Sequence, residues 1–363
     1  MNDSPAARAE IRVLVVDDSA FMRTALARMI TSEAGFEVVA TASSGAEALE
    51  RIPSLDPDVV TLDVQMPGLD GLATLRAIMQ KFPRPVIMVS AATEKDAHIT
   101  FSALSAGAFD YVPKQLSRSS LDISHIRSDL IAKIRAAAQA RRPSAPIGIR
   151  KSPRSVGFKA GDAPSLAAPA IVAIGSSTGG PKALQEILPC FPRDLPVPIL
   201  IVQHMPVGFT VPFAQRLDSL CALTVREATT RELIQPATVY IAPAGLHMRV
   251  EGRLSDGRPM ISLDPEPVDS LHIPSVDVCM KSVAAFYGNS ACGVIMTGMG
   301  SDGAEGMKAI YLAGGLTIGQ DESSCTVYGM PRVCAELGIL ARIVPLNEIP
   351  TQILQATRRR KPA

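Results

Sequence analysis

The chain has 363 residues, which is more than the roughly 250 at which single hydrophobic cores stop growing, so we expect two domains. Its hydrophobic content of 47% with 20% charged residues is typical of a globular protein and excludes a disordered or collagen-like chain. The formal net charge of +1 provides no overall field that would attract nucleic acid or an anionic membrane.

Short apolar runs alternate with helical patterns in the first part of the chain. Each run is followed by ten or more residues with apolar positions at helical spacing, and the runs occupy residues 11–18, 36–42, 58–64, 85–91 and 109–114. Because the runs are continuously apolar rather than alternating, we expect strands that are covered on both faces. The pattern predicts an α/β domain with a doubly wound parallel sheet over residues 10–135.

Charged and hydroxyl side chains stand where these predicted strands end: Asp17 and Asp18, Asp63, Ser90 and Lys114. The carboxyl ends of parallel strands share one edge of the sheet, so we expect these residues to converge there. Three carboxylates around one point need a cation, and oxygen ligands suit Mg²⁺. Asp63 could then accept a phosphoryl group that Lys114 holds. The alternative is that each carboxylate caps the helix after it.

The motifs VLVVDDSAFMR, DVVTLDVQMPGLDGL, MVSA and GAFDYVPK resemble the response-regulator receiver family, whose fold is flavodoxin-like. The resemblance places the phosphate acceptor at Asp63, the switch hydroxyl at Ser90 and the phosphate-binding lysine at Lys114. Tyr111 takes the place of the rotating aromatic residue, with a core tyrosine as the alternative. The implied Mg²⁺ ligands are Asp17, Asp18, Asp63 and the backbone carbonyl of Gln65.

A change of composition follows. Residues 139–168 are rich in Pro, Ser, Gly and basic residues and have no periodic apolar face, so we expect a flexible linker, with bounds of 136–168. A partner surface is the alternative for its basic residues, but like charge with low hydrophobicity favours a solvated tether. The basic segment RRRK at 358–361 is interpreted in the same way.

A second α/β pattern covers residues 169–356. Strands are predicted at 170–177, 198–205, 223–228, 238–245, 291–298 and 316–321, and helices at 179–190, 275–286, 302–313 and 330–337. Residues 247–264 interrupt the alternation and contain an Asp-Gly pair, which is typical of a hairpin turn. We expect a second doubly wound, Rossmann-like domain.

The segment IVAIGSSTGGP places Ser177 at a strand-to-helix turn. Free N–H groups at such a turn point toward negative charge, and Gly179 and Gly180 leave the approach open. An anion-binding loop with Ser177 or Thr178 as N-cap is the alternative.

Two partners for a serine nucleophile follow later strands: His204 and Asp302. Both can reach the sheet edge where Ser177 stands, which would provide nucleophile, base and orienting acid. The alternatives are a structural histidine and an aspartate that caps the helix beginning near Gly303.

The motifs AIGSSTGGP, VQHMP, VYIAPAGLH, SVDVCMKSVA, MTGMGSDGA and VYGMPR closely resemble the catalytic domain of the chemotaxis protein-glutamate methylesterase family. The resemblance implies Ser177 as nucleophile, His204 as base, Asp302 as acid and the backbone of Met299 as oxyanion donor. Ser176 stands where members of the family often have alanine. His247 and His272 are rival bases, but neither ends an apolar strand, so we expect them in the substrate groove or on the surface.

The two resemblances together imply a phosphorylation-switched serine hydrolase that takes part in chemotactic adaptation. A chemotaxis histidine kinase would phosphorylate Asp63 with Mg²⁺ and so relieve obstruction of the active site. The enzyme would then release methanol from glutamate methyl esters on chemoreceptor helices and deamidate glutamines, with no cofactor for the esterase step. The rival hypothesis is a regulator whose second domain only binds DNA or an anionic ligand, but no basic recognition helix or GxxxxGK[ST] motif is present.

The remaining sequence features indicate a cytoplasmic protein without membrane insertion. The six cysteines show no CxxC or paired spacing, so we expect reduced, mostly buried thiols. The N-terminal segment lacks a basic flank before an apolar stretch, and no run approaches the roughly 18 apolar residues of a membrane span.

Overall fold

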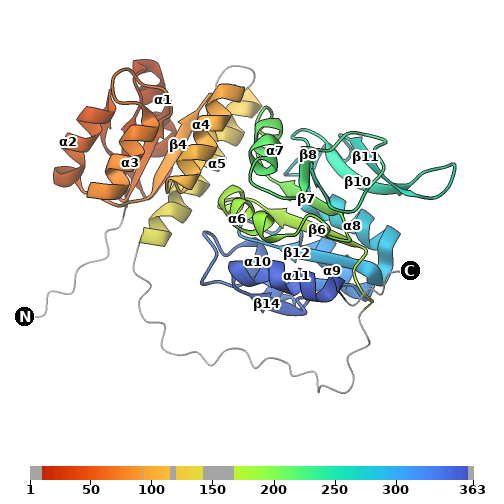
Figure 1. Ribbon diagram of the computed structural model, residues 1–363. Helices are drawn as coiled ribbons and strands as arrows, with labels where there is room; N and C mark the ends of the chain where they lie inside the picture. Colours follow the sequence, from red (N-terminus) through yellow and green to blue (C-terminus); the bar gives the residue numbers. More distant parts are fainter. Residues whose placement is uncertain (1–9, 92, 115–119, 142–166, 359–363) are drawn as a thin grey trace, which may run out of the picture. The chain divides into compact units, whose positions relative to one another are not determined.

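The computed structural model describes residues 10–91, 93–114, 120–141 and 167–358 (Figure 1). Contacts divide the chain into two compact units, with the division between residues 143 and 144. Each unit is an α/β structure built on a parallel sheet, which confirms the predicted fold class. Most of the predicted linker and residues 359–361 of the basic tail lie outside the described residues.

The first unit has a five-stranded sheet in the order β2-β1-β3-β4-β5, with every neighbouring pair parallel. Its strands are β1 (Ile11–Val16), β2 (Phe36–Ala42), β3 (Val59–Asp63), β4 (Val86–Ser90) and β5 (Asp110–Pro113). The helices are α1 (Ala20–Thr31), α2 (Gly45–Leu55), α3 (Gly71–Lys81), α4 (Glu94–Ser105) and α5 (Ser120–Arg141).

Helices cover both faces of this sheet, which explains its continuously apolar strands. Val13 and Val15 pack with α1 and α5 on one face, and α2, α3 and α4 contact one another in succession on the other. Strand order reverses between β1 and β3, and such a reversal opens a crevice at the carboxyl ends of the strands.

Helix α5 corrects the predicted start of the linker at residue 136. The helix continues to Arg141, because the Ala-rich segment after Ile134 has high helix propensity and buries Ala137 and Ala138 against the core of the unit.

The second unit has a seven-stranded parallel sheet in the order β14-β13-β12-β6-β7-β9-β8, and an antiparallel hairpin of β10 and β11 stands beside it. The sheet strands are β6 (Ile171–Ser176), β7 (Ile199–Gln203), β8 (Thr224–Glu227), β9 (Thr238–Ile241), β12 (Ala291–Ile295), β13 (Leu316–Gln320) and β14 (Arg342–Val344). The hairpin strands are β10 (His247–Gly252) and β11 (Pro259–Asp264).

The helices of the second unit are α6 (Gly180–Ile187), α7 (Thr210–Asp218), α8 (Val276–Tyr287), α9 (Ala304–Leu312), α10 (Met330–Glu336) and α11 (Ile349–Thr357). Turns of 3₁₀ helix cover Leu188–Cys190, Gly288–Ser290 and Leu346–Glu348. The sheet extends from β6 in both directions, through β7 on one side and β12 on the other, so its crevice opens at the end of β6.

The start of α8 lies against β6 and fixes the geometry at this edge. A Cβ atom at Gly175 would lie 2.3 Å from Val276 Cγ1, so only glycine allows this approach. Val276 also belongs to the buried core that joins β6 to α8, α9 and the hairpin. The first turn of α8 is therefore held beside the residues that follow β6.

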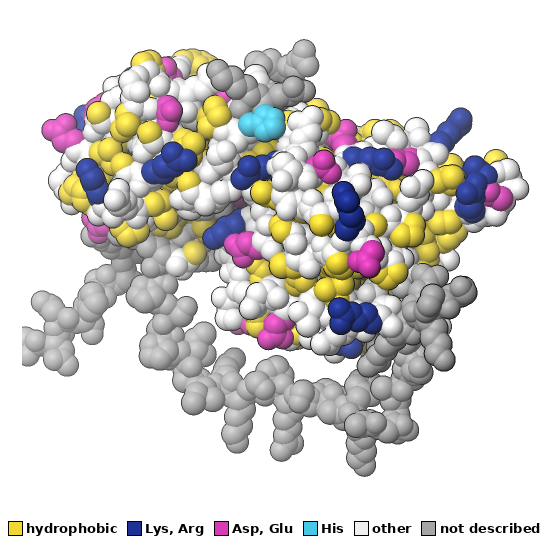
Figure 2. All heavy atoms as spheres, viewed as in Figure 1, with side chains coloured by type: hydrophobic (Ala, Val, Ile, Leu, Met, Phe, Trp, Pro, Cys, Tyr) yellow, Lys and Arg dark blue, Asp and Glu magenta, His cyan; other side chains and the backbone are white. Residues whose placement is uncertain are grey.

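Charged side chains of both signs share the face of the molecule that Figure 2 draws. On the face drawn in Figure 2, the Lys and Arg side chains stand among Asp and Glu side chains and form no continuous basic area. No helix in the described ranges is both long and apolar enough to cross a membrane. Of the six cysteines, three are buried, Cys190 is exposed and the others are partly exposed, so the thiols are less buried than expected.

Candidate active site and phosphorylation site

Ser177 follows the last residue of β6, and its N–H donates to the carbonyl of Thr297 at 3.0 Å. Gly179 occupies the N-cap of α6 with φ 78°, and no side chain caps this helix, so neither Ser177 nor Thr178 is an N-cap. A Cβ at Gly179 would lie 2.4 Å from Thr326 Oγ1. The turn thus requires glycine, and it leaves the Ser177 hydroxyl without a hydrogen bond to any residue that the structure describes.

Gln203, the buried last residue of β7, ties this turn to the next strand end. Its Nε2 donates to the carbonyl oxygens of Ser177 at 3.0 Å and His204 at 2.9 Å, and its Oε1 accepts from Ser176 Oγ at 2.7 Å. Gln203 was not among the residues predicted for the site. A polar side chain directly before His204 in an otherwise apolar strand was the available signal.

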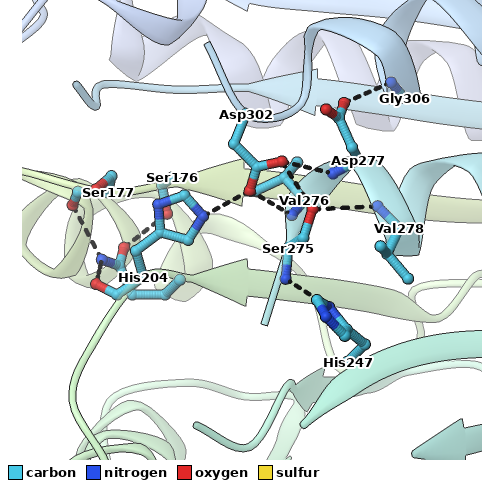
Figure 3. Close-up of polar contacts among 11 residues, drawn as sticks. Ser176, Ser177, His204, His247, Ser275, Val276, Asp277, Val278, Asp302 and Gly306 are labelled. Atoms are coloured by element: carbon cyan, nitrogen blue, oxygen red, sulfur yellow. Dashed lines mark hydrogen bonds and ion pairs between the residues drawn. The ribbon is translucent and has the colours of Figure 1, made fainter. Parts of the chain in front are cut away.

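His204 lies between the serine turn and Asp302 (Figure 3). Its Nε2 is 2.8 Å from Asp302 Oδ2, and both side chains are largely buried. The other ring nitrogen, Nδ1, is buried and has no hydrogen-bond partner among the described residues. A proton on Nε2, donated to Asp302, leaves the lone pair of Nδ1 free to accept a proton.

Asp302 accepts four hydrogen bonds. Oδ2 also accepts from the N–H of Val276 at 2.7 Å, while Oδ1 accepts from Ser275 Oγ at 2.8 Å and from the N–H of Asp277 at 3.0 Å (Figure 3). Burial alone raises the pKa of Asp302, but the hydrogen bond and charge of His204, with the two N–H groups, hold the pKa well below 3.8. Asp302 is therefore an ionised acceptor at the start of α8, and it does not cap its own helix, α9.

Asp277 provides the converse contact. Its Oδ1 accepts from the N–H of Gly306 in the first turn of α9 at 2.7 Å, where the N-cap residue Gly303 has no side chain to do so. Burial raises the pKa of Asp277 in spite of this hydrogen bond.

The loop after β12 faces the serine. Gly298 lies so close that a Cβ there would be 2.8 Å from Ser177 Cβ. The N–H of the next residue, Met299, donates to no acceptor in the part of the chain that the structure describes. This N–H is therefore available to a ligand bound at Ser177.

Of the two rival histidines, only His247 lies in a different place from that expected. His247 is fully buried rather than in a groove: its Nδ1 accepts from the N–H of Ser275 at 3.1 Å and its Nε2 lies 3.2 Å from the carbonyl of Pro267. With both ring nitrogens in use, His247 has no site for a substrate proton. His272 stacks on His204, with ring centroids 4.0 Å apart and planes inclined by 20°.

The carboxylates of the first unit converge as the strand ends predicted. Ligand oxygens of Asp17, Asp18 and Asp63 lie within 4.8 Å of one another, and Lys114 Nζ is 2.9 Å from Asp17 Oδ2 and 2.6 Å from Asp63 Oδ2. Burial raises the pKa of Asp63 to about 6, although Lys114 opposes this effect. Ser19 and Asp70 cap α1 and α3, so the clustered carboxylates are not helix caps.

The chemistry of this donor set fits Mg²⁺. Asp17 and Asp63 are almost fully buried, and only the Lys114 ammonium offsets their charges among the described side chains. An all-oxygen cluster with an exposed third carboxylate, Asp18, is what this cation prefers. Gln65 stands two residues after Asp63, and its N–H donates to Asp63 Oδ1 at 3.1 Å.

Ser90 and Tyr111, the two further residues of the predicted switch, are both buried. Ser90 Oγ is 2.9 Å from Thr100 Oγ1 on α4 and 3.2 Å from the carbonyl of Ala91. The Tyr111 ring meets Phe101 edge-on, with centroids 6.5 Å apart. Tyr111 is thus a buried side chain in this structure, and its role as the rotating aromatic residue stays a prediction.

Comparisons with known proteins agree over both units. Residues 172–353 match the family model of the CheB methylesterase, and residues 13–124 match the response regulator receiver domain. A relative from Oleidesulfovibrio alaskensis, named protein-glutamate methylesterase/protein-glutamine glutaminase 1, is 45% identical over 95% of this chain and 99% of its own length. A relative of that activity name from Pyrococcus abyssi is 43% identical over 97% of this chain and 95% of its own.

A solved structure gives the same result for the second unit. The crystal structure of the Thermotoga maritima CheB methylesterase catalytic domain is 40% identical, covers 52% of this chain and 98% of that one, and has a TM-score of 0.50. The chain thus belongs to the CheB methylesterase family and carries a response regulator receiver domain before the methylesterase domain.

Proposed function

We propose that the protein is a phosphorylation-activated serine hydrolase that demethylates glutamate methyl esters and deamidates glutamines on chemoreceptor helices. Support comes from the names of the relatives and from the second unit, where an ionised aspartate holds His204, which lies between that aspartate and the serine turn (Figure 3) and has an unused Nδ1. Within this proposal the receiver domain covers residues 10–135 and continues in α5 to Arg141, and the catalytic domain covers residues 169–356.

The ester cleavage begins with Ser177 and His204. His204 Nδ1 takes the proton of the Ser177 hydroxyl while Oγ bonds to the side-chain carbonyl carbon of the methylglutamate. The carbonyl oxygen becomes an oxyanion, and the N–H of Met299 donates to it. Asp302 holds the imidazolium through Nε2.

Collapse of this intermediate breaks the bond to the methoxy oxygen, which takes the proton from His204 and leaves as methanol. Water then gives a proton to Nδ1 and attacks the acyl carbon, which breaks the ester to Ser177 and returns the hydroxyl its proton. The products are methanol and a free glutamate side chain. The same steps on a glutamine release ammonia instead, which accounts for the second activity.

The first unit would act as the switch, with Asp63 as phosphate acceptor and a chemotaxis histidine kinase as donor. The oxygens of Asp17, Asp18, Asp63 and the Gln65 carbonyl would hold Mg²⁺, which supplies positive charge that offsets the oxygens of the phosphoryl group. Lys114 would pass from the carboxylates to the phosphate, and Ser90 would turn to the same group. We infer a cytoplasmic location because the substrate helices and the kinase act there.

The observation that carries this proposal is the His204–Asp302 pair with its unused Nδ1. A serine-reactive phosphonate tests it, since only an activated hydroxyl forms the phosphonyl adduct. We expect a single adduct on Ser177 in the full chain, lost in Ser177→Ala and kept in Ser176→Ala. Labelling that is equal in all three chains would contradict the assignment.

A further inference from the structure

Ser275 is the residue before α8, and its hydroxyl contacts the proposed acid from the side away from the base. Oδ2 of Asp302 faces His204 Nε2 and the N–H of Val276, whereas Oδ1 faces Ser275 Oγ at 2.8 Å and the N–H of Asp277. Of the donors on Oδ1, only the Ser275 hydroxyl belongs to a side chain, so substitution can remove it.

The position of Ser275 is itself fixed. It is almost fully buried, and its N–H donates to Nδ1 of the buried His247, whose other nitrogen lies 3.2 Å from the carbonyl of Pro267. A hydrogen-bonded series therefore runs from His247 through Ser275 to Asp302, and from there to His204 (Figure 3). The carbonyl of Pro267 begins this series at His247 Nε2. Each member of this series orients the next one.

Aspartate carboxyl groups rotate readily, because the terminal torsion of this side chain has a broad, two-fold preference. A carboxylate held only through Oδ2 can swing out of the plane that the imidazole needs. Donors on Oδ1 oppose that rotation. We propose that Ser275 is a positioning residue of the active site, whose hydroxyl fixes the carboxylate plane of Asp302 and thereby orients His204 toward Ser177.

This inference rests on the proposed function, and a purely structural role must be separated from it. Ser275 is also the N-cap of α8, where its Oγ accepts from the N–H of Val278 at the longer distance of 3.4 Å. One hydroxyl can serve both contacts, as donor to Asp302 and acceptor from Val278. Glycine is nearly as good an N-cap as serine, whereas threonine keeps the hydroxyl.

The test compares Ser275→Gly and Ser275→Thr with the unaltered full chain in methanol release from methylated receptor membranes. We expect Ser275→Gly to lower kcat about tenfold with little change in KM, because a weakened transition-state contact acts on kcat. Ser275→Thr should recover most of the activity. The urea midpoints of all three chains should nearly coincide, because glycine replaces a serine cap at small cost.

A double-mutant cycle supplies the second readout. Removing the Ser275 hydroxyl should slow phosphonate labelling of Ser177 in the unaltered chain but not in an Asp302→Ala background, where nothing remains to position. An unchanged kcat in Ser275→Gly, equal losses in the glycine and threonine variants, or additive effects in the cycle would each overturn the proposal. Absence of Ser177-dependent methanol release from the unaltered chain would instead reject the proposed function.

Discussion

Asp302 and Asp277 cap each other's helices: Asp302 caps α8, which contains Asp277, and Asp277 caps α9, which Asp302 precedes. Asp302 precedes α9 but accepts from the N–H groups of Val276 and Asp277 at the start of α8, while Asp277 in α8 accepts from the N–H of Gly306 in α9. The positive end of the α8 dipole thus stabilises the charge on Asp302. The proposed acid is held by the packing of two helices rather than by its own loop.

Replacement of the acid by its amide should abolish most activity. The amide in Asp302→Asn carries no negative charge, so it accepts hydrogen bonds from His204 Nε2 and from the α8 N–H groups less strongly. The base then loses the tautomer with its proton on Nε2. We expect kcat for methanol release to fall about 10⁴-fold, with substrate binding largely retained. A loss smaller than tenfold would show that Asp302 does not orient the base.

The same substitution should have a pH-dependent effect on stability. The folded state lowers the pKa of Asp302 below its ordinary value of 3.8, so its ionised form stabilises the fold fully above that pH, and this contribution is lost as the pH falls toward the folded pKa. The gap in unfolding free energy between the unaltered chain and Asp302→Asn should be constant near neutral pH and narrow in acid. Urea titrations at about pH 7 and about pH 3 measure it, and a gap that widens in acid would contradict the sign.

Loss of the converse cap should reduce stability modestly. Asp277→Ala removes the acceptor for the N–H of Gly306, and we expect the unfolding free energy of the second unit to fall by about 1 kcal/mol. Glu305→Ala is the matched control. Glu305 precedes Gly306 in the first turn of α9, but its side chain is exposed and does not cap the helix. Equal urea midpoints for Asp277→Ala and Glu305→Ala would argue against the capping of α9 by Asp277.

Strand ends could be predicted from sequence, but hydrogen-bond partners could not. Continuous apolar runs placed Asp63, Ser177 and His204 at sheet edges, where the structure has them. The acceptor role of Asp302 toward α8 depends on the close contact of Val276 with Gly175, which only the fold creates. The same holds for buried His247, whose neighbours come from distant segments.

Two helices and one strand of the second unit were not predicted from the sequence pattern. These are helices α7 and α11 and the edge strand β14, which has only the three residues Arg342–Val344. Contact of α7 with β8 and pairing of β14 with β13, rather than local preference, decide the structure of these two elements.

The Lys114 ammonium should be replaceable by a divalent cation. Lys114→Met leaves the buried Asp17 and Asp63 without their ion pairs, so in chelator we expect the unfolding free energy of the first unit to fall by about 3 kcal/mol. Mg²⁺ should raise the unfolding midpoint more in this variant than in the unaltered chain. Lys81→Met, at an exposed helix end, is the control. Equal shifts with Mg²⁺ in all three chains would show that Lys114 and the cation do not replace each other, and no shift in any chain would contradict a cation site at these carboxylates.

Thr100 should restrain the switch hydroxyl. Its Oγ1 lies 2.9 Å from Ser90 Oγ, and Ser90 has to leave this contact to reach a phosphate on Asp63. Thr100→Val removes this hydrogen bond, of about 1 kcal/mol, together with the contact of Thr100 Oγ1 with the Asp96 carbonyl within α4. A small phosphodonor should therefore activate the variant at several-fold lower concentration. Ser102→Ala, on the exposed side of α4, serves as control. Identical dose-response curves for Thr100→Val and the unaltered chain would count against this restraint.

The most direct test of the central claim is methanol release from methylated chemoreceptor membranes by the full chain and by Ser177→Ala, each with and without a small phosphodonor and Mg²⁺. The account predicts release that requires Ser177 and increases with the phosphodonor, and an Asp63→Asn chain that keeps basal release but loses the increase. Release that persists in Ser177→Ala, or that is absent from the unaltered chain under every condition, would contradict it.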